Sequence, residues 1–320
     1  MSESTSVLLR TTFSPVLLDK LAGRHHELVG PVDGDLAQAL DEATRDRITA
    51  LVTMGSSRID ASVMDALPKI AVICCSGAGY DGIDLQEAAR RGIAVSHSPS
   101  ANAGSVADFA IGLMIASVRR IVSLDRYMHT GAWQGNSVSR VPTVRGLTSR
   151  KAGVYGMGSI GKKIAQRAAA FDMEVGYFSR RPKEDVPYQY FPSLMAMAQW
   201  ADVLMVSVEA NASTRHTVDA AVLEALGPDG HVVNVSRGYV IDEDALISAL
   251  QSGRLGGAGL DVFEHEPVIP AALMQLDNVV ITPHIAGTSK QSQEIQYDMI
   301  VANLDHFLAT GKVLNAVPGA

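Results

Sequence analysis

The stretch that decides the fold is Ala152–Tyr155 followed by Gly156-Met157-Gly158-Ser159-Ile160-Gly161, a GxGxxG pattern. An apolar segment precedes the glycines, and the helical pattern Ile160–Phe171 follows them. The glycines permit a tight turn, close approach of a pyrophosphate to the backbone, and close packing of the helix on the strand. Free N–H groups at the helix start attract phosphates. This order predicts a dinucleotide-binding unit, with a glycine-rich connection that binds nothing as the alternative.

Short apolar runs alternate with helical patterns on both sides of this motif, which is typical of parallel sheets covered by helices. The expected strands are Val7–Leu9, Ala50–Thr53, Ile70–Cys75, Ala94–Ser96, Val175–Phe178, Val203–Val208, Val232–Val235, Gly257–Val262 and Val279–Thr282. One long helix is expected from about Ala103 to Met128, and an amphipathic helix from about Gln291 to Leu308. The fold class is therefore predicted to be α/β, with two doubly wound parallel-sheet domains (Rossmann-like or flavodoxin-like) and a cleft between them.

The composition narrows the class of protein. The chain has 320 residues, of which 47% are hydrophobic and 19% charged, as in an ordinary globular protein of about two domains. A net charge of -7 argues against nucleic acid as the main partner. No apolar stretch approaches the about 18 residues that span a bilayer, and the first residues do not resemble a secretory signal. We therefore expect a cytoplasmic protein with no membrane partner, and we predict no metal site.

The two cysteines, Cys74 and Cys75, are adjacent in an apolar run. Neighbouring strand residues point to opposite faces, so an unstrained disulfide between them is not expected. We predict buried thiols in a reducing compartment; a redox role is the alternative.

Cofactor choice depends on the tip of the strand after the glycine motif. An NAD site usually has Asp or Glu there to hold the ribose hydroxyls, but Met173–Phe178 ends in Ser179-Arg180-Arg181. A carboxylate would repel a 2′-phosphate, whereas arginines and a serine hydroxyl bind one. The sequence therefore predicts NADP(H) as the preferred cofactor, with NAD(H) also accepted. The alternative is that the arginines only solvate an exposed turn.

Three polar residues follow expected strands in the second half of the chain: Arg237, Glu266 and His284. Ligands of open α/β sheets bind beyond the carboxyl ends of the strands, so these residues are expected to converge. Arg offers a planar fork to a substrate carboxylate. A protonated His can give a proton to a carbonyl oxygen as hydride arrives at its carbon, and a carboxylate favours the charged imidazole. This set predicts reduction of a 2-oxo acid, although each residue alone also has a purely structural interpretation.

Taken together, these segments resemble the D-isomer-specific 2-hydroxyacid dehydrogenase family over nearly the whole chain. The matching segments are Gly156–Gly161, Val233–Gly238, Gly259–Phe263, Glu266-Pro267, Thr282–Gly287, Ser76–Asp84 and Ser105–Asp108. The resemblance implies Arg237 as substrate binder, His284 as acid/base and Glu266 as its partner. It also implies that the backbone amides of Gly77, Ala78 and Gly79 bind the substrate carboxylate.

The resemblance carries further expectations. Cofactor contacts are expected from the glycine turn (Gly156, Met157, Gly158, Ser159, Ile160), the arginine tip (Ser179, Arg180, Arg181), and Val208, Val235, Arg237, Asp261, His284 and Gly287. Residues 1–100 with 286–320 would form a discontinuous substrate-binding domain, and residues 101–285 the dinucleotide-binding domain. A homodimer formed through the cofactor domain and the long helix is expected.

The sequence departs from the common family pattern at two places, and the first of them indicates the branch. The Ser179-Arg180-Arg181 tip resembles the NADPH-preferring glyoxylate/hydroxypyruvate reductases. Glu209-Ala210-Asn211-Ala212 stands where many members carry proline, which puts local cofactor contacts in doubt. The leading hypothesis is reduction of glyoxylate or hydroxypyruvate to the D-2-hydroxy acid. The alternatives are a reductase of a larger 2-oxo acid such as 2-ketogluconate, and a non-catalytic NAD(P)-sensing protein related to co-repressors.

Overall fold

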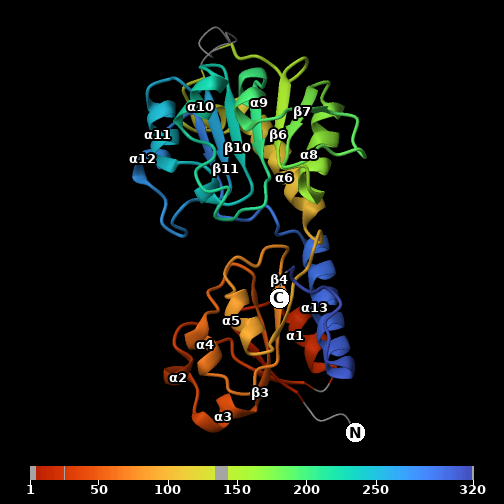
Figure 1. Cartoon of the computed structure of the whole chain (residues 1–320). Coiled ribbons are helices and arrows are strands. Elements are labelled where there is room, and N and C mark those ends of the chain that lie inside the picture. The colour runs from red at the N-terminus through yellow and green to blue at the C-terminus, as the bar shows by residue number, and fades with distance from the viewer. Residues whose placement is uncertain (1–4, 25, 134–142, 319–320) are drawn as a thin grey trace. The chain divides into compact units, whose positions relative to one another are not determined.

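The chain folds into two compact units in the computed structural model, which describes residues 5–24, 26–133 and 143–318. The first unit comprises Met1–Asn102 and Ser289–Ala320, and the second comprises Ala103–Thr288. Each unit holds one parallel sheet with helices packed on both faces (Figure 1). The predicted class of two doubly wound parallel-sheet α/β domains is confirmed.

The first unit is built on five parallel strands in the order β2-β1-β3-β4-β5. They are β1 (Ser6–Leu9), β2 (Glu27–Val29), β3 (Ile48–Met54), β4 (Val72–Ser76) and β5 (Ala94–Ser96). Helices α1 (Pro15–Ala22) and α13 (Lys290–Thr310) share one hydrophobic core with the sheet. Helices α2 (Leu36–Ala39), α4 (Ala61–Asp65) and α5 (Leu85–Arg90) share the other, while α3 (Glu42–Arg47) buries no residue.

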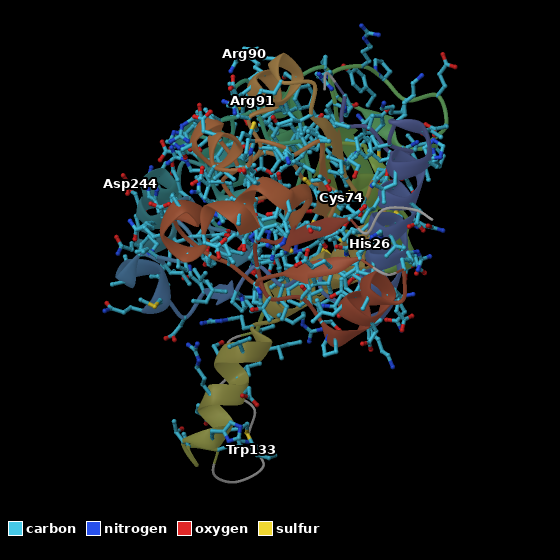
Figure 2. All side chains as sticks on the ribbon, turned by 90° about the horizontal axis from the view of Figure 1, so that it is seen from below. His26, Cys74, Arg90, Arg91, Trp133 and Asp244 are labelled. Atoms are coloured by element: carbon cyan, nitrogen blue, oxygen red, sulfur yellow. The ribbon has the colours of Figure 1, made fainter. Side chains whose placement is uncertain are left out.

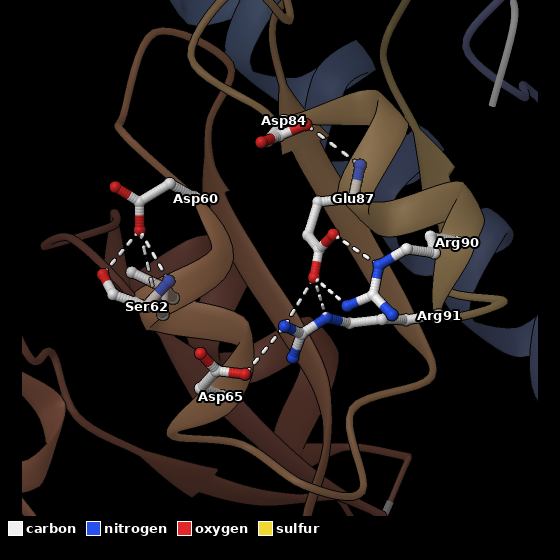
Figure 3. Close-up of polar contacts among 8 residues, drawn as sticks. Asp60, Ser62, Asp65, Asp84, Glu87, Arg90 and Arg91 are labelled. Atoms are coloured by element: carbon white, nitrogen blue, oxygen red, sulfur yellow. Dashed lines mark hydrogen bonds and ion pairs between the residues drawn. The ribbon is translucent and has the colours of Figure 1, made fainter.

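A surface network of charges joins α4 to the end of α5 (Figure 3). The Glu87 carboxylate accepts hydrogen bonds from Arg90 and Arg91, and Arg91 also reaches Asp65 at 2.7 Å. The bonds from Arg90 and Arg91 lower the pKa of Glu87 to about 2. The Arg91–Asp65 pair is the link between the two helices, and because Asp65 is 69% exposed this link stabilises the fold little.

The second unit is built on seven parallel strands in the order β12-β11-β10-β9-β6-β7-β8. They are β6 (Lys151–Tyr155), β7 (Glu174–Phe178), β8 (Gln189–Tyr190), β9 (Val203–Val206), β10 (His231–Asn234), β11 (Gly257–Leu260) and β12 (Val279–Ile281). The order reverses at β6, which pairs with β7 on one side and β9 on the other. Such a switch point leaves a crevice beyond the strand ends, where open α/β sheets bind ligands.

Helices cover both faces of this second sheet and enclose two separate cores. Helices α6 (Ala103–Val118) and α8 (Ser159–Ala170) pack on one face. Helices α9 (Leu194–Trp200), α10 (Ala220–Leu226) and α11 (Glu243–Gln251) pack on the other, and α12 (Ala271–Met274) lies beside β12.

The prediction of one helix from Ala103 to Met128 is wrong. Helix α6 ends at Val118, Arg120 adopts a left-handed conformation with φ 54°, and a new helix α7 runs over Ile121–His129. Helix α6 is apolar because it is buried between α8 and the sheet, whereas no residue of α7 is buried. The apolar pattern therefore continues past Arg120, although the chain leaves the hydrophobic core there. The sequence also predicts a loop over Gly131–Ser149, which is rich in Gly, Pro, Ser and Thr and has little periodicity; this segment lies partly outside the described residues.

The two cysteines are free thiols on β4, both 1% exposed, and Figure 2 labels Cys74. Burial raises the pKa of Cys74 to about 11 and that of Cys75 to about 12. Since the thiolate is the reactive form, neither is a candidate nucleophile at neutral pH. Within residues 5–24, 26–133 and 143–318, no helix has the length and apolarity to cross a bilayer, and no three His, Cys, Asp or Glu side chains group around a common metal position.

Candidate active site

The glycine turn between β6 and α8 has the geometry that the motif predicts. Gly156 has φ +97°, and a Cβ there would lie 2.5 Å from the Val208 Cα. A Cβ on Gly161 would lie 1.9 Å from the Gly156 carbonyl oxygen. A Cβ on Gly158 would meet nothing within 4 Å. The outer glycines are thus required by the chain itself, whereas the middle one leaves open space beside the backbone for a ligand.

The start of α8 is suited to an anion. Gly158 is its N-cap, and no side chain caps the helix. An open pocket of about 530 Å³ beside the turn is lined by Met157, Gly158, Ser159, Lys162, Lys163, Gln166 and Lys183. Helix N-terminal amides and lysine side chains both attract phosphate groups. These residues fit a dinucleotide.

The tip of β7 carries the three residues expected to choose the cofactor. The Ser179 hydroxyl donates to the Arg181 carbonyl at 2.7 Å. The Arg180 guanidinium lies 3.8 Å from the Glu209 carboxylate, and their side chains are 90% and 63% exposed. This exposed pair is weak, so Arg180 remains available to a phosphate. Glu209 is an opposing charge that the sequence reasoning did not identify.

The structure brings Glu266 and His284 together at neighbouring strand ends. The His284 Nδ1 lies 2.6 Å from one Glu266 carboxylate oxygen, and the Phe263 amide donates to the other at 3.0 Å. Burial raises the pKa of Glu266, but the bonds from His284 and Phe263 and the charges of His284 and Arg237 outweigh it, so the pKa is lowered. Glu266 is therefore anionic at neutral pH and can favour a charged imidazole.

Asp261 anchors the loop that carries His284. Its carboxylate is 1% exposed and accepts hydrogen bonds from the Thr282 hydroxyl (2.6 Å) and from the amides of Ile285 (3.0 Å) and Ala286 (2.8 Å). These bonds hold a loop in which His284 has φ 51°, a conformation that is strained for a residue with a side chain. In this structure the Asp261 carboxylate therefore binds groups of the protein's own His284 loop.

Asn234 plays a similar part for Arg237, and the sequence reasoning missed it. Its side-chain amide donates to the Arg237 carbonyl at 2.9 Å, and its side-chain oxygen accepts from the Ser236 amide at 3.0 Å. A Cβ on Gly238 would lie 1.9 Å from the Phe263 carbonyl carbon. The Arg237 turn therefore packs directly against the segment that leads to Glu266. The available signal was one amide in the otherwise apolar strand Val232–Val235.

The remaining expected residues divide between the two units. Met157 and Val235 are 2% and 8% exposed, so they can offer a ligand mainly their backbone. Gly287 follows the loop that Asp261 holds. The expected substrate loop Gly77, Ala78 and Gly79 belongs to the first unit, directly after β4.

Comparisons with known proteins agree with this arrangement. The family model described as D-isomer specific 2-hydroxyacid dehydrogenase, NAD binding domain, matches residues 111–286. A glyoxylate/hydroxypyruvate reductase from Arabidopsis thaliana is 38% identical over 313 residues, covering 98% of each chain. A 2-ketogluconate reductase from Gluconobacter oxydans is 39% identical over 270 residues, covering 84% of this chain and 86% of the relative.

The whole fold is also similar to that of a solved structure. The NADPH-dependent glyoxylate/hydroxypyruvate reductase from Sinorhizobium meliloti, in complex with NADP and malonate, has a TM-score of 0.90 and 35% identity. The match covers 99% of this chain and 98% of that one. The resemblance drawn from the sequence motifs is confirmed: the chain belongs to the D-isomer-specific 2-hydroxyacid dehydrogenases and is an NAD(P)-dependent oxidoreductase.

Proposed function

We propose that this enzyme uses NADPH to reduce a small 2-oxo acid of the glyoxylate/hydroxypyruvate type at C2, giving the D-2-hydroxy acid. The observation that carries the proposal is the His284–Glu266 pair, joined at 2.6 Å in the same unit as the dinucleotide turn. The relatives named glyoxylate/hydroxypyruvate reductases support the substrate class. Residues 103–288 would then be the dinucleotide-binding domain and the other unit the substrate-binding domain.

In the proposed mechanism, Arg237 binds the substrate carboxylate through its planar guanidinium. A reduced nicotinamide, held by the unit that carries the glycine turn, would supply the hydride to C2. Because the Nδ1 of His284 is engaged by Glu266, Nε2 is the nitrogen that can face the carbonyl oxygen. His284 donates its proton there as negative charge develops. The anionic Glu266 orients the imidazole and favours its charged form.

The cofactor preference gives a direct prediction. Arg180, Arg181 and Ser179 would bind the 2′-phosphate, and each charge-assisted bond contributes about 1.5–3 kcal/mol before solvent screening. We expect kcat/KM with NADPH to exceed that with NADH by at least about tenfold, and the ratio to fall as salt rises. The double variant Arg180→Ala/Arg181→Ala should lose most of this preference while keeping its NADH activity. Steady-state kinetics with both cofactors measures the ratio.

Two matched variants sharpen this test. Glu209→Gln removes the carboxylate that lies 3.8 Å from Arg180, so it should increase the preference for NADPH. Arg167→Ala removes an arginine of α8 that is paired with Asp108, and it should leave the ratio unchanged. Equal use of NADH and NADPH by the wild-type enzyme at low salt would show that the arginines are ordinary surface residues.

A second substrate class is supported by the 2-ketogluconate reductase relative. Values of kcat/KM for glyoxylate, hydroxypyruvate and 2-ketogluconate, measured with NADPH, decide between the two classes. The proposal expects the smaller acids to be preferred and hydroxypyruvate to yield D-glycerate on chiral chromatography. A preference for 2-ketogluconate, or an L-product, would contradict it.

We also propose that the enzyme is a homodimer formed through α7. A nine-residue helix with no buried residue is not stable in water by itself, so α7 needs a partner surface. Ile121, Met128 and Trp133 are each about half exposed on or just beyond this helix, and Figure 2 labels Trp133. A second copy of the chain would cover these apolar side chains.

Sedimentation velocity tests the dimer. The mass obtained for the wild-type protein should be twice the chain mass of 33.9 kDa. The double variant Ile121→Glu/Met128→Glu should sediment as a monomer, because two charges would be buried without partners. Ile295→Glu changes an equally exposed isoleucine on α13 and should leave the dimer intact. A monomeric wild-type protein, or a dimeric double variant, would refute this interface.

We place the enzyme in the cytoplasm, with a small-molecule 2-oxo acid and NADPH as its partners and with no requirement for nucleic acid or membrane. Both cysteines are free thiols, as expected in a reducing compartment. Fractionation of the source cells followed by immunoblotting tests the location. Retention in the membrane fraction or export from the cell would contradict it.

A further inference from the structure

We propose that His97 is a positioning residue for the substrate, because it sets the orientation of the amides that bind the substrate carboxylate. This inference rests on the proposed function and on the expectation, implied by the family resemblance, that the backbone amides of Gly77, Ala78 and Gly79 bind the substrate carboxylate alongside Arg237. His97 follows β5 directly, and the loop follows β4, the neighbouring parallel strand. Both segments therefore leave the sheet at the same edge.

The carbonyl groups of the loop are held from the β5 side. The Ser98 amide donates to the Gly77 carbonyl at 2.8 Å. The His97 Nδ1 lies 2.9 Å from the Ala78 carbonyl. Since a carbonyl oxygen only accepts, this nitrogen must carry the proton, and the bond fixes which ring nitrogen is protonated. His97 is thus the side chain that holds the second peptide of the loop.

Holding these carbonyls determines where the amides point. In a trans peptide, the carbonyl oxygen of one residue and the N–H of the next point in opposite directions. The amides of Ala78 and Gly79 are therefore directed away from Ser98 and His97. Within the described residues neither amide donates a hydrogen bond. Two adjacent amide donors that both point away from the β5 side are suited to the two oxygens of a carboxylate.

Neighbouring segments contact the loop on both sides. On the β3 side, a Cβ on Gly55 would lie only 1.7 Å from the Gly79 carbonyl oxygen. Tyr80 packs edge-on against the His97 ring, with centroids 5.3 Å apart. The His97 amide donates to the Asn315 carbonyl at 3.1 Å, so the C-terminal segment fixes the histidine in turn. The backbone of Gly55 therefore packs against one side of the loop, and hydrogen bonds from Ser98 and His97 hold the other side.

Two substitutions separate the hydrogen bond from the volume of the side chain. His97→Leu fills similar space without a donor. His97→Asn places an amide nitrogen at the position of Nδ1 and retains the donor. We expect His97→Leu to raise KM for the 2-oxo acid about three- to tenfold, the effect of one lost hydrogen bond. The KM for NADPH should not change, and His97→Asn should return the substrate KM to within about twofold of wild type.

A control variant completes the test. His306→Leu replaces a histidine of α13 in the same unit and should leave the substrate KM unchanged. An unchanged substrate KM in His97→Leu, or an equal rise in His97→Leu and His97→Asn, would overturn the inference while leaving the proposed function in place. Absence of turnover by the wild-type enzyme on any 2-oxo acid would instead overturn both.

Discussion

Replacing His284 by Asn is expected to lower the turnover of a 2-oxo acid by about 10²–10⁴-fold, the usual contribution of a positioned general acid. Asparagine can still accept or donate a hydrogen bond, but it cannot deliver a proton to the carbonyl oxygen. The affinity for NADPH should change little, because Gly156–Gly161 and the β7 tip are untouched. Steady-state kinetics, with cofactor binding measured separately by fluorescence, checks both expectations.

The pH dependence of the reaction distinguishes proton donation from simple positioning. Reduction should weaken as the pH rises and the imidazolium loses its proton, while oxidation of the hydroxy acid should strengthen. In Glu266→Gln the imidazolium loses its anionic partner, so the decline of reduction should move to lower pH. His265→Asn, a change in the same turn, serves as the control. Wild-type turnover by a folded His284→Asn variant would remove His284 from the mechanism.

Arg237→Lys is expected to cause the second large loss, although it retains the positive charge. Lysine is a point charge without the planar fork that binds both oxygens of a carboxylate. Loss of one charge-assisted bond of about 1.5–3 kcal/mol corresponds to roughly ten- to a hundredfold in kcat/KM. The KM for the 2-oxo acid should rise and kcat should fall. Kinetics with varied 2-oxo acid at saturating NADPH measures both.

A control in the same unit is Arg254→Lys, which changes an arginine bound only to Ser248 and Ser252 in the described structure. It should behave as wild type. Asn234→Ala provides a second comparison, because it removes the side chain that holds the Arg237 carbonyl while leaving the guanidinium present. An Arg237→Lys enzyme with an unchanged substrate KM would show that Arg237 has a structural role only.

The proximity of Glu266 and His284 was predictable because parallel strands end at one edge of a sheet. Glu266 lies in the turn that follows β11, His284 lies just after β12, and β11 and β12 are neighbours in the structure. The glycine turn was predictable for a similar reason, since its chemistry depends on local spacing. These features need only short-range patterns and the general rule for where parallel sheets bind ligands.

Other features depend on contacts that a single sequence does not contain. Asp261 and Asn234 bind mainly backbone groups, and backbone partners leave no residue-specific trace. Strands β2 and β8 were missed because they are short edge strands with little buried surface. The break at Arg120 was missed because the apolar pattern of α6 continues into exposed residues of α7. In each case the deciding factor is what the rest of the fold places beside the residue.

The central claim, that this chain is a working reductase rather than a cofactor-sensing protein, is tested most directly by one assay. Purified protein is mixed with NADPH and glyoxylate, and the absorbance of the reduced nicotinamide is followed over time. The account predicts continuous NADPH oxidation that requires the 2-oxo acid and that is lost in His284→Asn. Binding of NADPH without turnover on glyoxylate, hydroxypyruvate or 2-ketogluconate would contradict it and identify a sensing protein instead.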